Sequence, residues 1–266
     1  MTAAELVACA LAEDVGPRDI TTELCVPAEK KATARFIVRE PLVVAGTEVL
    51  PLLYDNVEIK AKDGTLLQPG GEIAIATGSA RQLLTRERVA LNFLQHLSGI
   101  ATLAREFVDQ VAGTKCRILD TRKTTPGFRQ LEKAAAHAGG VTNHRMGLYD
   151  AVLIKNNHIT AAGGVRVALE ATRNANVPVE IEVRTRAELD EALACGAKAL
   201  LLDNLTPEAA KEWITAIAGR ATVELSGGIT LENVRAYAQA GADFVSSGAI
   251  THSARAVDIH CRLELS

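Results

Sequence analysis

Residues 117–129, RILDTRKTTPGFR, place basic side chains directly after a short apolar run. Arg122 and Lys123 follow the run, and Arg129 lies just beyond a Pro-Gly pair. Guanidinium groups suit carboxylates and phosphates because they donate two parallel hydrogen bonds. A surface loop needs polarity, but it does not need this much positive charge. These residue types therefore predict an anion-binding site.

The positive charge continues along the chain from residue 121 to residue 155. This stretch carries a local charge of +4 in a protein whose formal net charge is −3. Its basic residues are Arg122, Lys123, Arg129, Lys133, Arg145 and Lys155, and its acidic residues are Glu132 and Asp150. Such an array predicts a ligand that carries several negative groups.

Lys155 ends the apolar segment DAVLIK, and two kinds of chemistry suit a lysine in that place. It could form a Schiff base, as lysines do in barrel aldolases. It could instead be a fixed positive charge for an anionic ligand. A Schiff-base lysine is helped by a neighbouring cation but does not need an array of them. The surrounding charge therefore favours the second role.

Two acidic residues close apolar segments further along the chain: Glu182 in VPVEIEVRT and Asp203 in AKALLLDN. Carboxylate oxygens suit Mg²⁺, held directly or through water, and they also stabilise positive charge that develops on a sugar. The alternative is a structural ion pair with the basic residues described above. The residues alone leave both interpretations open.

Two short loops rich in glycine and serine, in ELSGGIT and SSGAIT, lead from apolar runs into helical sequence. Glycine lets the backbone approach an anion closely, and the N–H groups at the start of a helix favour phosphate. The loops after the last two strands are the usual phosphate site of a parallel barrel. Tight turns that bind no ligand are the alternative.

The segments that position these residues alternate between apolar runs and helical patterns. The runs are CRILDTRK, YDAVLIKNNH, VPVEIEVRT, AKALLLDN, ATVELSGG and ADFVSSGA. This alternation predicts a parallel sheet with crossover helices, forming a barrel or part of one. In a closed parallel barrel the carboxyl ends of the strands meet at one mouth, so the polar groups that end these runs are expected there together.

The first eighty residues have a different pattern. KATARFIVRE alternates apolar and polar residues, and Asp63-Gly64 and residues 69–71 mark turns, which predicts a small antiparallel sheet. A helical pattern then runs from Thr85, the expected N-cap, to about Val111. Ser98-Gly99 inside it weakens a helix by about 1 kcal/mol, so we expect close packing at that point.

Composition limits the classes of function. The chain has 266 residues, 48% of them hydrophobic and only 3% aromatic, which argues against a base-stacking platform for nucleic acid. Its five cysteines form no C-x-x-C pair, which indicates reduced thiols in a cytoplasmic protein. The N-terminal sequence is typical of an amphipathic helix rather than a signal peptide. No apolar run approaches the ~18 residues needed to span a bilayer.

Long motifs, in order along the chain, resemble the quinolinate phosphoribosyltransferase family. They are DTRKTTPGFR, GGVTNHRMGLYDAVLIKNNHI, EIEVRTRAELDEAL, LLLDN, ELSGGI and SSGAITHS, together with EDVGPRDITTELCVP and TRERVALNFLQHLSGIAT near the N-terminus. The resemblance covers nearly the whole chain.

The resemblance implies a mixed α/β fold with two domains. We expect an N-terminal α/β sandwich over residues 1–112 and an incomplete parallel α/β barrel over residues 113–254, with the tail at 255–266 packed on the first domain. It also implies a homodimer or higher oligomer with active sites shared between subunits. No nucleic acid or membrane is expected as a partner.

The same resemblance implies a reaction of NAD biosynthesis. Phosphoribosyl pyrophosphate and quinolinate would give nicotinate mononucleotide, pyrophosphate and CO₂, with Mg²⁺ as cofactor. The residues that would hold the quinolinate carboxylates are Arg122, His144, Arg145 and Lys155, with Arg88 from a partner subunit.

Other residues would hold the second substrate. Thr121 and Lys123 would help bind substrate anions, while Glu182 and Asp203 would face the ribose and its Mg²⁺. The residues that would bind the 5′-phosphate are Ser226, Gly227, Gly228, Ser247, Gly248 and Ala249. Lys155, Glu182 and Asp203 are the expected catalytic residues, acting by positioning and electrostatics.

Three alternatives remain beside this interpretation. The first is a phosphoribosyltransferase of the same fold that acts on nicotinate or another aromatic acid. The second is an aldolase that uses Lys155 as a Schiff base. The third is a regulatory protein that senses phosphate without turnover.

Overall fold

The structure, a computed structural model, describes residues 1–265 and divides the chain into two compact units. The first unit comprises Met1–Arg105, Thr124–Gly140 and Ile250–Ser266, and the second comprises Glu106–Lys123 and Val141–Ala249. The contiguous ranges expected from the sequence, 1–112 and 113–254, therefore differ from the observed division. The main difference concerns residues 124–140, which contain helix α5 (Arg129–Ala138) and belong to the first unit.

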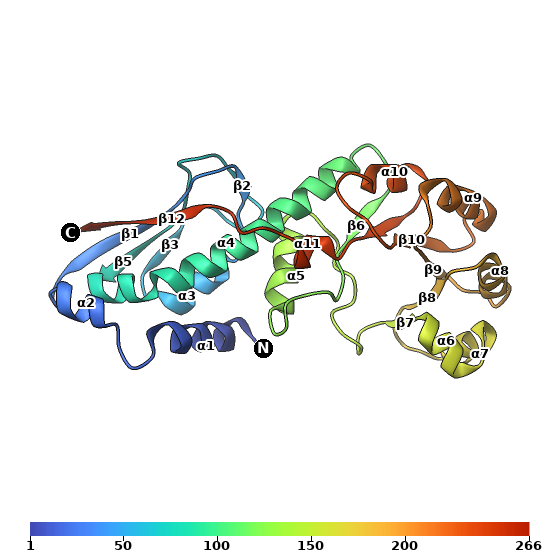
Figure 1. The fold of residues 1–266 in the computed structure, drawn as a ribbon, viewed down its shortest axis with the longest axis horizontal. Helices are drawn as coiled ribbons and strands as arrows, with labels where there is room; N and C mark the ends of the chain where they lie inside the picture. The colour runs from blue at the N-terminus through green and yellow to red at the C-terminus, as the bar shows by residue number, and fades with distance from the viewer. Residues whose placement is uncertain (266) are drawn as a thin grey trace. The chain divides into compact units, whose positions relative to one another are not determined.

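The first unit contains a four-stranded antiparallel sheet in the order β12-β1-β5-β3 (Figure 1). The strands are β1 (Lys31–Val38), β3 (Val57–Ile59), β5 (Glu72–Ser79) and β12 (Ile259–Leu265). Buried positions alternate with less buried ones along most of β1, as its sequence predicts. The last strand pairs with β1 over seven residues, so the C-terminal segment belongs to this sheet. A second pair, β2 (Leu42–Val43) and β4 (Leu66–Leu67), lies in the same unit.

The helices of this unit include one much longer than the others. They are α1 (Ala3–Val15), α2 (Ile20–Cys25), η1 (Thr47–Val49), α3 (Leu50–Leu53), α4 (Ala80–Gln110) and α5, and α4 continues past the unit boundary. The buried stripe expected along α4 is present: Val89, Phe93, Leu97, Ile100, Ala104, Phe107 and Val111 are all buried.

Helix α4 begins at Ala80, directly after β5, so the prediction of Thr85 as its N-cap is wrong. The hydroxyl of Thr85 instead donates a hydrogen bond to Asp19 Oδ2 at 2.9 Å. Residues 80–84, ARQLL, are good helix formers, and the helix therefore extends back to the end of the strand.

The interruption inside α4 is explained by packing. Ser98 is fully buried, and its hydroxyl bonds to both the N–H and the carbonyl oxygen of Ala45. A Cβ added to Gly99 would lie 2.0 Å from the carbonyl oxygen of Arg255. The expectation of close packing at Ser98-Gly99 is confirmed.

The second unit contains a six-stranded parallel sheet in the order β6-β11-β10-β9-β8-β7 (Figure 1). The strands are β6 (Arg117–Leu119), β7 (Val152–Ile154), β8 (Val179–Val183), β9 (Ala199–Asp203), β10 (Thr222–Ser226) and β11 (Phe244–Ser246). From β7 to β11 each strand pairs with the next in sequence, and β11 then pairs with the first strand, β6. This is the order of a barrel left open between β6 and β7.

Helices connect these strands and lie in an arc outside them (Figure 1). They are α6 (Asn156–Ala162), α7 (Val165–Ala171), α8 (Arg186–Ala194), α9 (Pro207–Ile217) and α10 (Val234–Gln239). The short helix α11 (Ala249–His252) follows β11 and leads to β12 of the antiparallel sheet. Thr206 caps α9 by accepting the N–H of Ala209, and Pro207 occupies the first turn, as the sequence predicts. The fold is thus mixed α/β, with an antiparallel unit and an incomplete parallel barrel.

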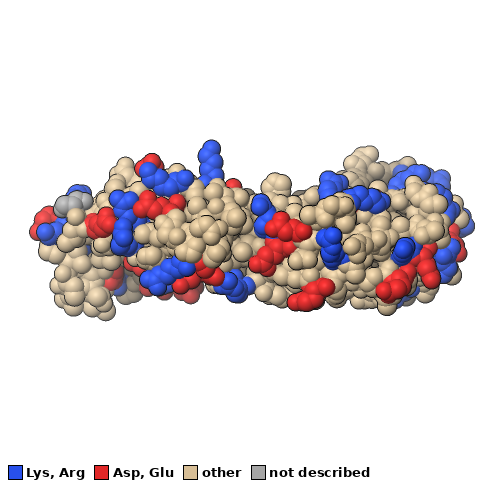
Figure 2. Space-filling model, turned by 90° about the horizontal axis from the view of Figure 1, so that it is seen from above, with Lys and Arg blue, Asp and Glu red and all other residues tan. Residues whose placement is uncertain are grey.

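The surface carries charges of both signs. Acidic and basic side chains are interspersed over the face seen in Figure 2. No helix among the described residues is long and apolar enough to cross a membrane.

Candidate active site

Most predicted site residues of the second unit lie at the carboxyl ends of its strands; His144 and Arg145 lie in the segment between α5 and β7. Parallel strands present these ends at one edge of the sheet. Lys155 follows β7, Glu182 lies in β8 and Asp203 ends β9. The loops after three other strands hold the rest: Thr121, Arg122 and Lys123 after β6, Ser226, Gly227 and Gly228 at the end of β10, and Ser247, Gly248 and Ala249 after β11. Arg88 lies apart from them in sequence, on α4 of the first unit.

Lys155 and Glu182 face each other from neighbouring strands. The Nζ atom of Lys155 lies 3.8 Å from Oε2 of Glu182, and the lysine side chain is 52% exposed whereas that of Glu182 is 11% exposed. The backbone N–H of Lys155 donates to Nδ1 of His158 at 2.9 Å, which holds the start of α6. The pair presents one positive and one negative group at the strand ends.

Asp203 lies on the same face of the sheet as Glu182, because Glu182 pairs with Leu201, two residues before it. Its Oδ2 atom accepts a hydrogen bond from the side-chain amide of Asn204 at 2.7 Å. The backbone N–H of Asn204 in turn donates to the carbonyl oxygen of Ser226 at 2.9 Å. The loop after β9 is therefore tied to the glycine loop after β10.

Gly227 cannot carry a side chain in this arrangement. Its φ is +100°, and an added Cβ would lie 2.3 Å from Oδ1 of Asn204. The next loop is tied to the same region, since the hydroxyl of Ser247 donates to the carbonyl oxygen of Ile229 at 2.8 Å. The glycine-containing loops after β10 and β11 are therefore joined to each other.

Asp120, fully buried at the end of β6, holds the segment that follows α5. Its Oδ2 atom accepts the side-chain amide of Asn143 at 2.6 Å, and its Oδ1 atom accepts the backbone N–H of His144 at 2.8 Å. This segment also makes a parallel bridge from Thr142 to Leu119. The contacts fix the backbone that carries Arg145.

The charges of Arg122 and Arg145 act on each other in this unit. Burial, and then the positive charge of Arg122, lower the pKa of Arg145, against the opposing effect of Asp150 and Glu180. Arg145 also donates from Nη1 to the carbonyl oxygen of Ala151 at 3.1 Å. Two like charges held together favour binding of an anion, because an anion relieves their repulsion.

His144 lies between two acidic residues that the sequence interpretation missed. Its Nε2 atom is 3.4 Å from Oε2 of Glu180 and 3.4 Å from Oε2 of Glu224. Its Nδ1 atom accepts the backbone N–H of Arg145 at 2.7 Å. Both ring nitrogens thus have partners within the unit, so contact between this ring and a substrate carboxylate stays a prediction.

The protonation of His144 and that of Glu180 and Glu224 depend on one another. Burial opposes a charge on His144, but its hydrogen bonds to Glu180 and Glu224 outweigh burial and raise its pKa to about 9. Burial, assisted by the charge of Glu224, raises the pKa of Glu180. The cluster therefore retains one proton more at neutral pH than the separate groups would. Since Nδ1 accepts the N–H of Arg145, the ring is neutral with its single proton on Nε2, and the additional proton lies on a carboxylate, in keeping with the raised pKa of Glu180.

Two protein-family models match this chain, one over most of each unit's sequence. The profile of the quinolinate phosphoribosyl transferase C-terminal domain matches residues 100–262, and that of the N-terminal domain matches residues 19–98. The chain belongs to the quinolinate phosphoribosyltransferase family.

Individual relatives of this family are similar over nearly the whole chain. A probable nicotinate-nucleotide pyrophosphorylase [carboxylating] of Bacillus subtilis is 40% identical over 96% of this chain and 91% of the relative. The nicotinate-nucleotide pyrophosphorylase [carboxylating] of Mycobacterium leprae is 43% identical over 91% and 89%. The crystal structure of the nicotinate-nucleotide pyrophosphorylase of Ehrlichia chaffeensis has a TM-score of 0.94 at 37% identity, covering 99% of both chains.

In this quinolinate phosphoribosyltransferase family member, two sets of residues have the donor types that a metal ion needs. Glu182 and Asp203 offer oxygen donors on one face of neighbouring strands, which suits Mg²⁺. His144, Glu180 and Glu224 place one donor atom each within 4.8 Å of one another. The second set fits a metal poorly, because a bound ion would move the ring proton of His144 to Nδ1, against the N–H of Arg145.

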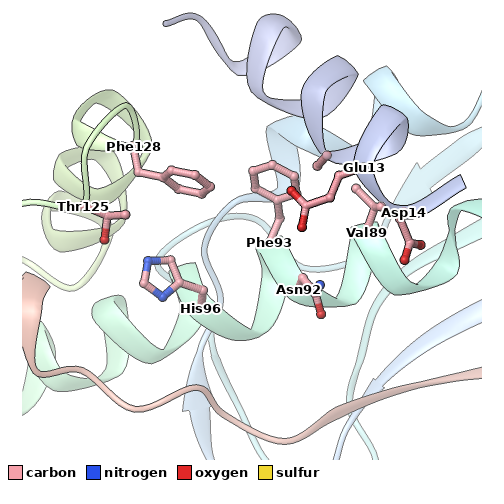
Figure 3. Close-up of a pocket in the computed structure, with 9 residues that line it drawn as sticks. Glu13, Asp14, Val89, Asn92, Phe93, His96, Thr125 and Phe128 are labelled. Atoms are coloured by element: carbon pink, nitrogen blue, oxygen red, sulfur yellow. The ribbon is translucent and has the colours of Figure 1, made fainter. Parts of the chain in front are cut away.

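The first unit has a pocket of its own, of about 370 Å³, which no sequence pattern predicted (Figure 3). Phe93 and Phe128 stack there at 5.7 Å between ring centroids, and Glu13 and Asp14 of α1 line one side. His96 lies at the other side, 2.9 Å from the buried Glu132.

Proposed function

We propose that this chain transfers phosphoribosyl from phosphoribosyl pyrophosphate to quinolinate, releasing pyrophosphate and CO₂ and giving nicotinate mononucleotide. Quinolinate carries two carboxylates on neighbouring ring carbons, so it needs more than one cation. The observation that carries this choice is the grouping of Arg122 and Arg145 in one unit with Lys155 at its strand ends.

The quinolinate carboxylates would bind to this group of cations. Arg122 and Arg145 offer forked donors that match a carboxylate, and the half-exposed ammonium of Lys155 offers a point charge. Thr121 and Lys123 lie in the same loop, where the N–H of Lys123 donates to the hydroxyl of Thr121 at 3.0 Å. This loop would contact the remaining substrate anions.

Glu182 and Asp203 would serve the ribose and Mg²⁺. Bound Mg²⁺ would neutralise part of the diphosphate charge and so favour its departure. Coordination through water suits Glu182, since Lys155 Nζ lies 3.8 Å from its Oε2 and the N–H of Asn156 lies 3.5 Å from its Oε1. Both carboxylates would also stabilise the positive charge that develops on the ribose.

The two loops after β10 and β11 would hold the 5′-phosphate. Gly227 and Gly228 both have positive φ, and they expose backbone to a ligand. Ser226 and the residues from Ser247 to Ala249 complete the proposed cradle.

Little acid–base chemistry is required of the protein. The ring nitrogen attacks the ribose as pyrophosphate leaves, and the quaternised ring then loses CO₂ from the neighbouring carbon. The protein holds the reacting atoms together and supplies fixed charges, which are the main sources of catalysis here.

We further propose a homodimer, or a higher oligomer, in which Arg88 enters the partner's site. Support comes from the family resemblance and from sequence position: Arg88 lies on α4, in the unit that does not contain the strand ends. The five cysteines, all free, fit the reducing conditions of a cytoplasmic enzyme.

The test is turnover with phosphoribosyl pyrophosphate, Mg²⁺ and quinolinate labelled in the carboxylate next to the ring nitrogen. We expect labelled CO₂, pyrophosphate and nicotinate mononucleotide in equal amounts. Pyrophosphate released from nicotinate but not from quinolinate would favour the nicotinate enzyme. Binding of both substrates without any turnover would favour a sensor.

A further inference from the structure

The side chains of His144, Glu180 and Glu224 meet inside the barrel, and the family resemblance assigns no role to either acid. Glu180 and Glu224 lie on β8 and β10, and each approaches the same ring atom, Nε2 of His144, at 3.4 Å. The side chain of Glu224 is only 3% exposed. A buried carboxylate of this kind needs donors, and the ring supplies one.

The other ring nitrogen determines where the proton of the ring lies. Nδ1 accepts the backbone N–H of Arg145 at 2.7 Å, which requires a lone pair on Nδ1. The ring proton therefore lies on Nε2, where the two carboxylates accept it. Glu180 and Glu224 thus favour the tautomer of His144 whose Nδ1 can accept a hydrogen bond from the backbone N–H of Arg145.

Further hydrogen bonds hold Glu224 on one side of the His144 ring and the backbone of His144 on the other. The hydroxyl of Ser246 on β11 donates to Oε1 of Glu224 at 2.6 Å, so both carboxylate oxygens of Glu224 are engaged. On the other side, Asp120 accepts the backbone N–H of His144 at 2.8 Å. The backbone of His144 is therefore held by the residue after β6, and its ring is held by acids of β8 and β10.

We propose that Glu180 and Glu224 are positioning residues that orient His144 and, through its ring, place Arg145 for binding a substrate carboxylate. In this arrangement the ring of His144 supports the backbone N–H of Arg145. The orientation of Arg145 matters because a forked pair with a carboxylate requires the guanidinium plane to face it. The inference rests on the proposed function in one respect, that Arg145 binds quinolinate.

The geometry also excludes a simpler use of the cluster as a metal site. A metal on Nε2 would require the proton on Nδ1, and that proton would point at the N–H of Arg145. The bond that supports Arg145 would be lost. The arrangement observed is the one that a hydrogen-bonded support needs.

The kinetic test compares Glu224→Met with Glu224→Gln. Methionine removes both acceptor oxygens, so we expect KM for quinolinate to rise about ten- to one-hundredfold, the usual effect of losing a supporting contact. KM for phosphoribosyl pyrophosphate should not change. Glutamine keeps an acceptor oxygen for Nε2 of His144, and its amide N–H can donate to the hydroxyl oxygen of Ser246, so it should restore most of the lost affinity. Equal rises in both KM values, or no recovery with glutamine, would overturn the proposal.

A second measurement needs no turnover, and it uses a variant only to assign one signal. Long-range ¹H–¹⁵N NMR of wild-type protein labelled on histidine reports which ring nitrogen carries the proton, and His144→Gln assigns the signal. We expect Nδ1 of His144 unprotonated at neutral pH, without change on addition of Mg²⁺ or Zn²⁺. A protonated Nδ1, or a metal-dependent shift, would contradict the proposal. If quinolinate is not turned over at all, the proposed function fails while this result still decides the role of the acids.

Discussion

At the scale of the residue, Lys155 shows how surroundings assign a role. Lysines that form Schiff bases are activated by apolar burial or by neighbouring cations. The side chain of Lys155 is 52% exposed, and its ion-pair partner is the carboxylate of Glu182 at 3.8 Å. These surroundings support a fixed charge rather than a nucleophile.

Substitution of Lys155 separates the two roles. Lys155→Arg keeps the charge and should keep measurable quinolinate binding, whereas Lys155→Ala should lose it. Isothermal titration with quinolinate measures both. Borohydride added in the presence of substrate should leave the wild-type enzyme active, and a mass adduct on Lys155 with loss of activity would overturn the assignment.

The sequence indicated the residues at strand ends more readily than those inside the barrel. Lys155, Glu182 and Asp203 each end or nearly end an apolar run, so their position was visible. Glu180 and Glu224 lie within strands, where an isolated acid gives no indication of its partner. The alternation Glu180-Ile181-Glu182 was a usable signal, because alternate residues of a strand share a face. Nothing local could have predicted that His144 would join them, since its contacts depend on tertiary packing.

At the scale of the element, helix α4 illustrates packing that overrides propensity. Gly99 costs a helix about 1 kcal/mol relative to alanine. It is nevertheless required, since a Cβ there would lie 2.0 Å from the carbonyl oxygen of Arg255. The sequence indicated this tight contact but not its partner, which lies 156 residues further along the chain.

Gly99→Ala should therefore lower the free energy of unfolding, by about 2 kcal/mol, since overpacking costs more than the helix gains. Urea unfolding followed by circular dichroism measures the change. Gly78→Ala is the matched control, because its Cβ would find nothing closer than Gln82 Oε1 at 3.8 Å. A Gly99→Ala variant at least as stable as wild type would show that the backbone at Arg255 yields at little cost.

At the scale of the whole molecule, the parallel sheet and its partial barrel followed from the alternation of strands and helices. The sequence did not indicate that residues 124–140 belong to the first unit. Helix α5 lies between two barrel strands in sequence, and only its contacts, such as Glu132 with His96 at 2.9 Å, reveal the unit to which it belongs.

Mixing two inactive variants tests the proposed sharing of sites between subunits. Arg88→Ala and Lys155→Ala homodimers should each be nearly inactive, because each site lacks one cation. After subunit exchange, about half of the dimers should be mixed, each with one intact site of two, so roughly a quarter of wild-type activity should return. Mixtures that exchange fully, as native mass spectrometry would show, yet stay inactive would place Arg88 in its own subunit or outside the site.

The central claim is that the site is built for a dicarboxylate, and the ratio of kcat/KM for quinolinate over nicotinate tests it most directly. Both acids are assayed with saturating phosphoribosyl pyrophosphate and Mg²⁺, following pyrophosphate release. Removal of one carboxylate leaves the group of Arg122, Arg145 and Lys155 short of one negative charge in the occupied site, so we predict a ratio of at least ~10³. Comparable values for the two acids would contradict the account.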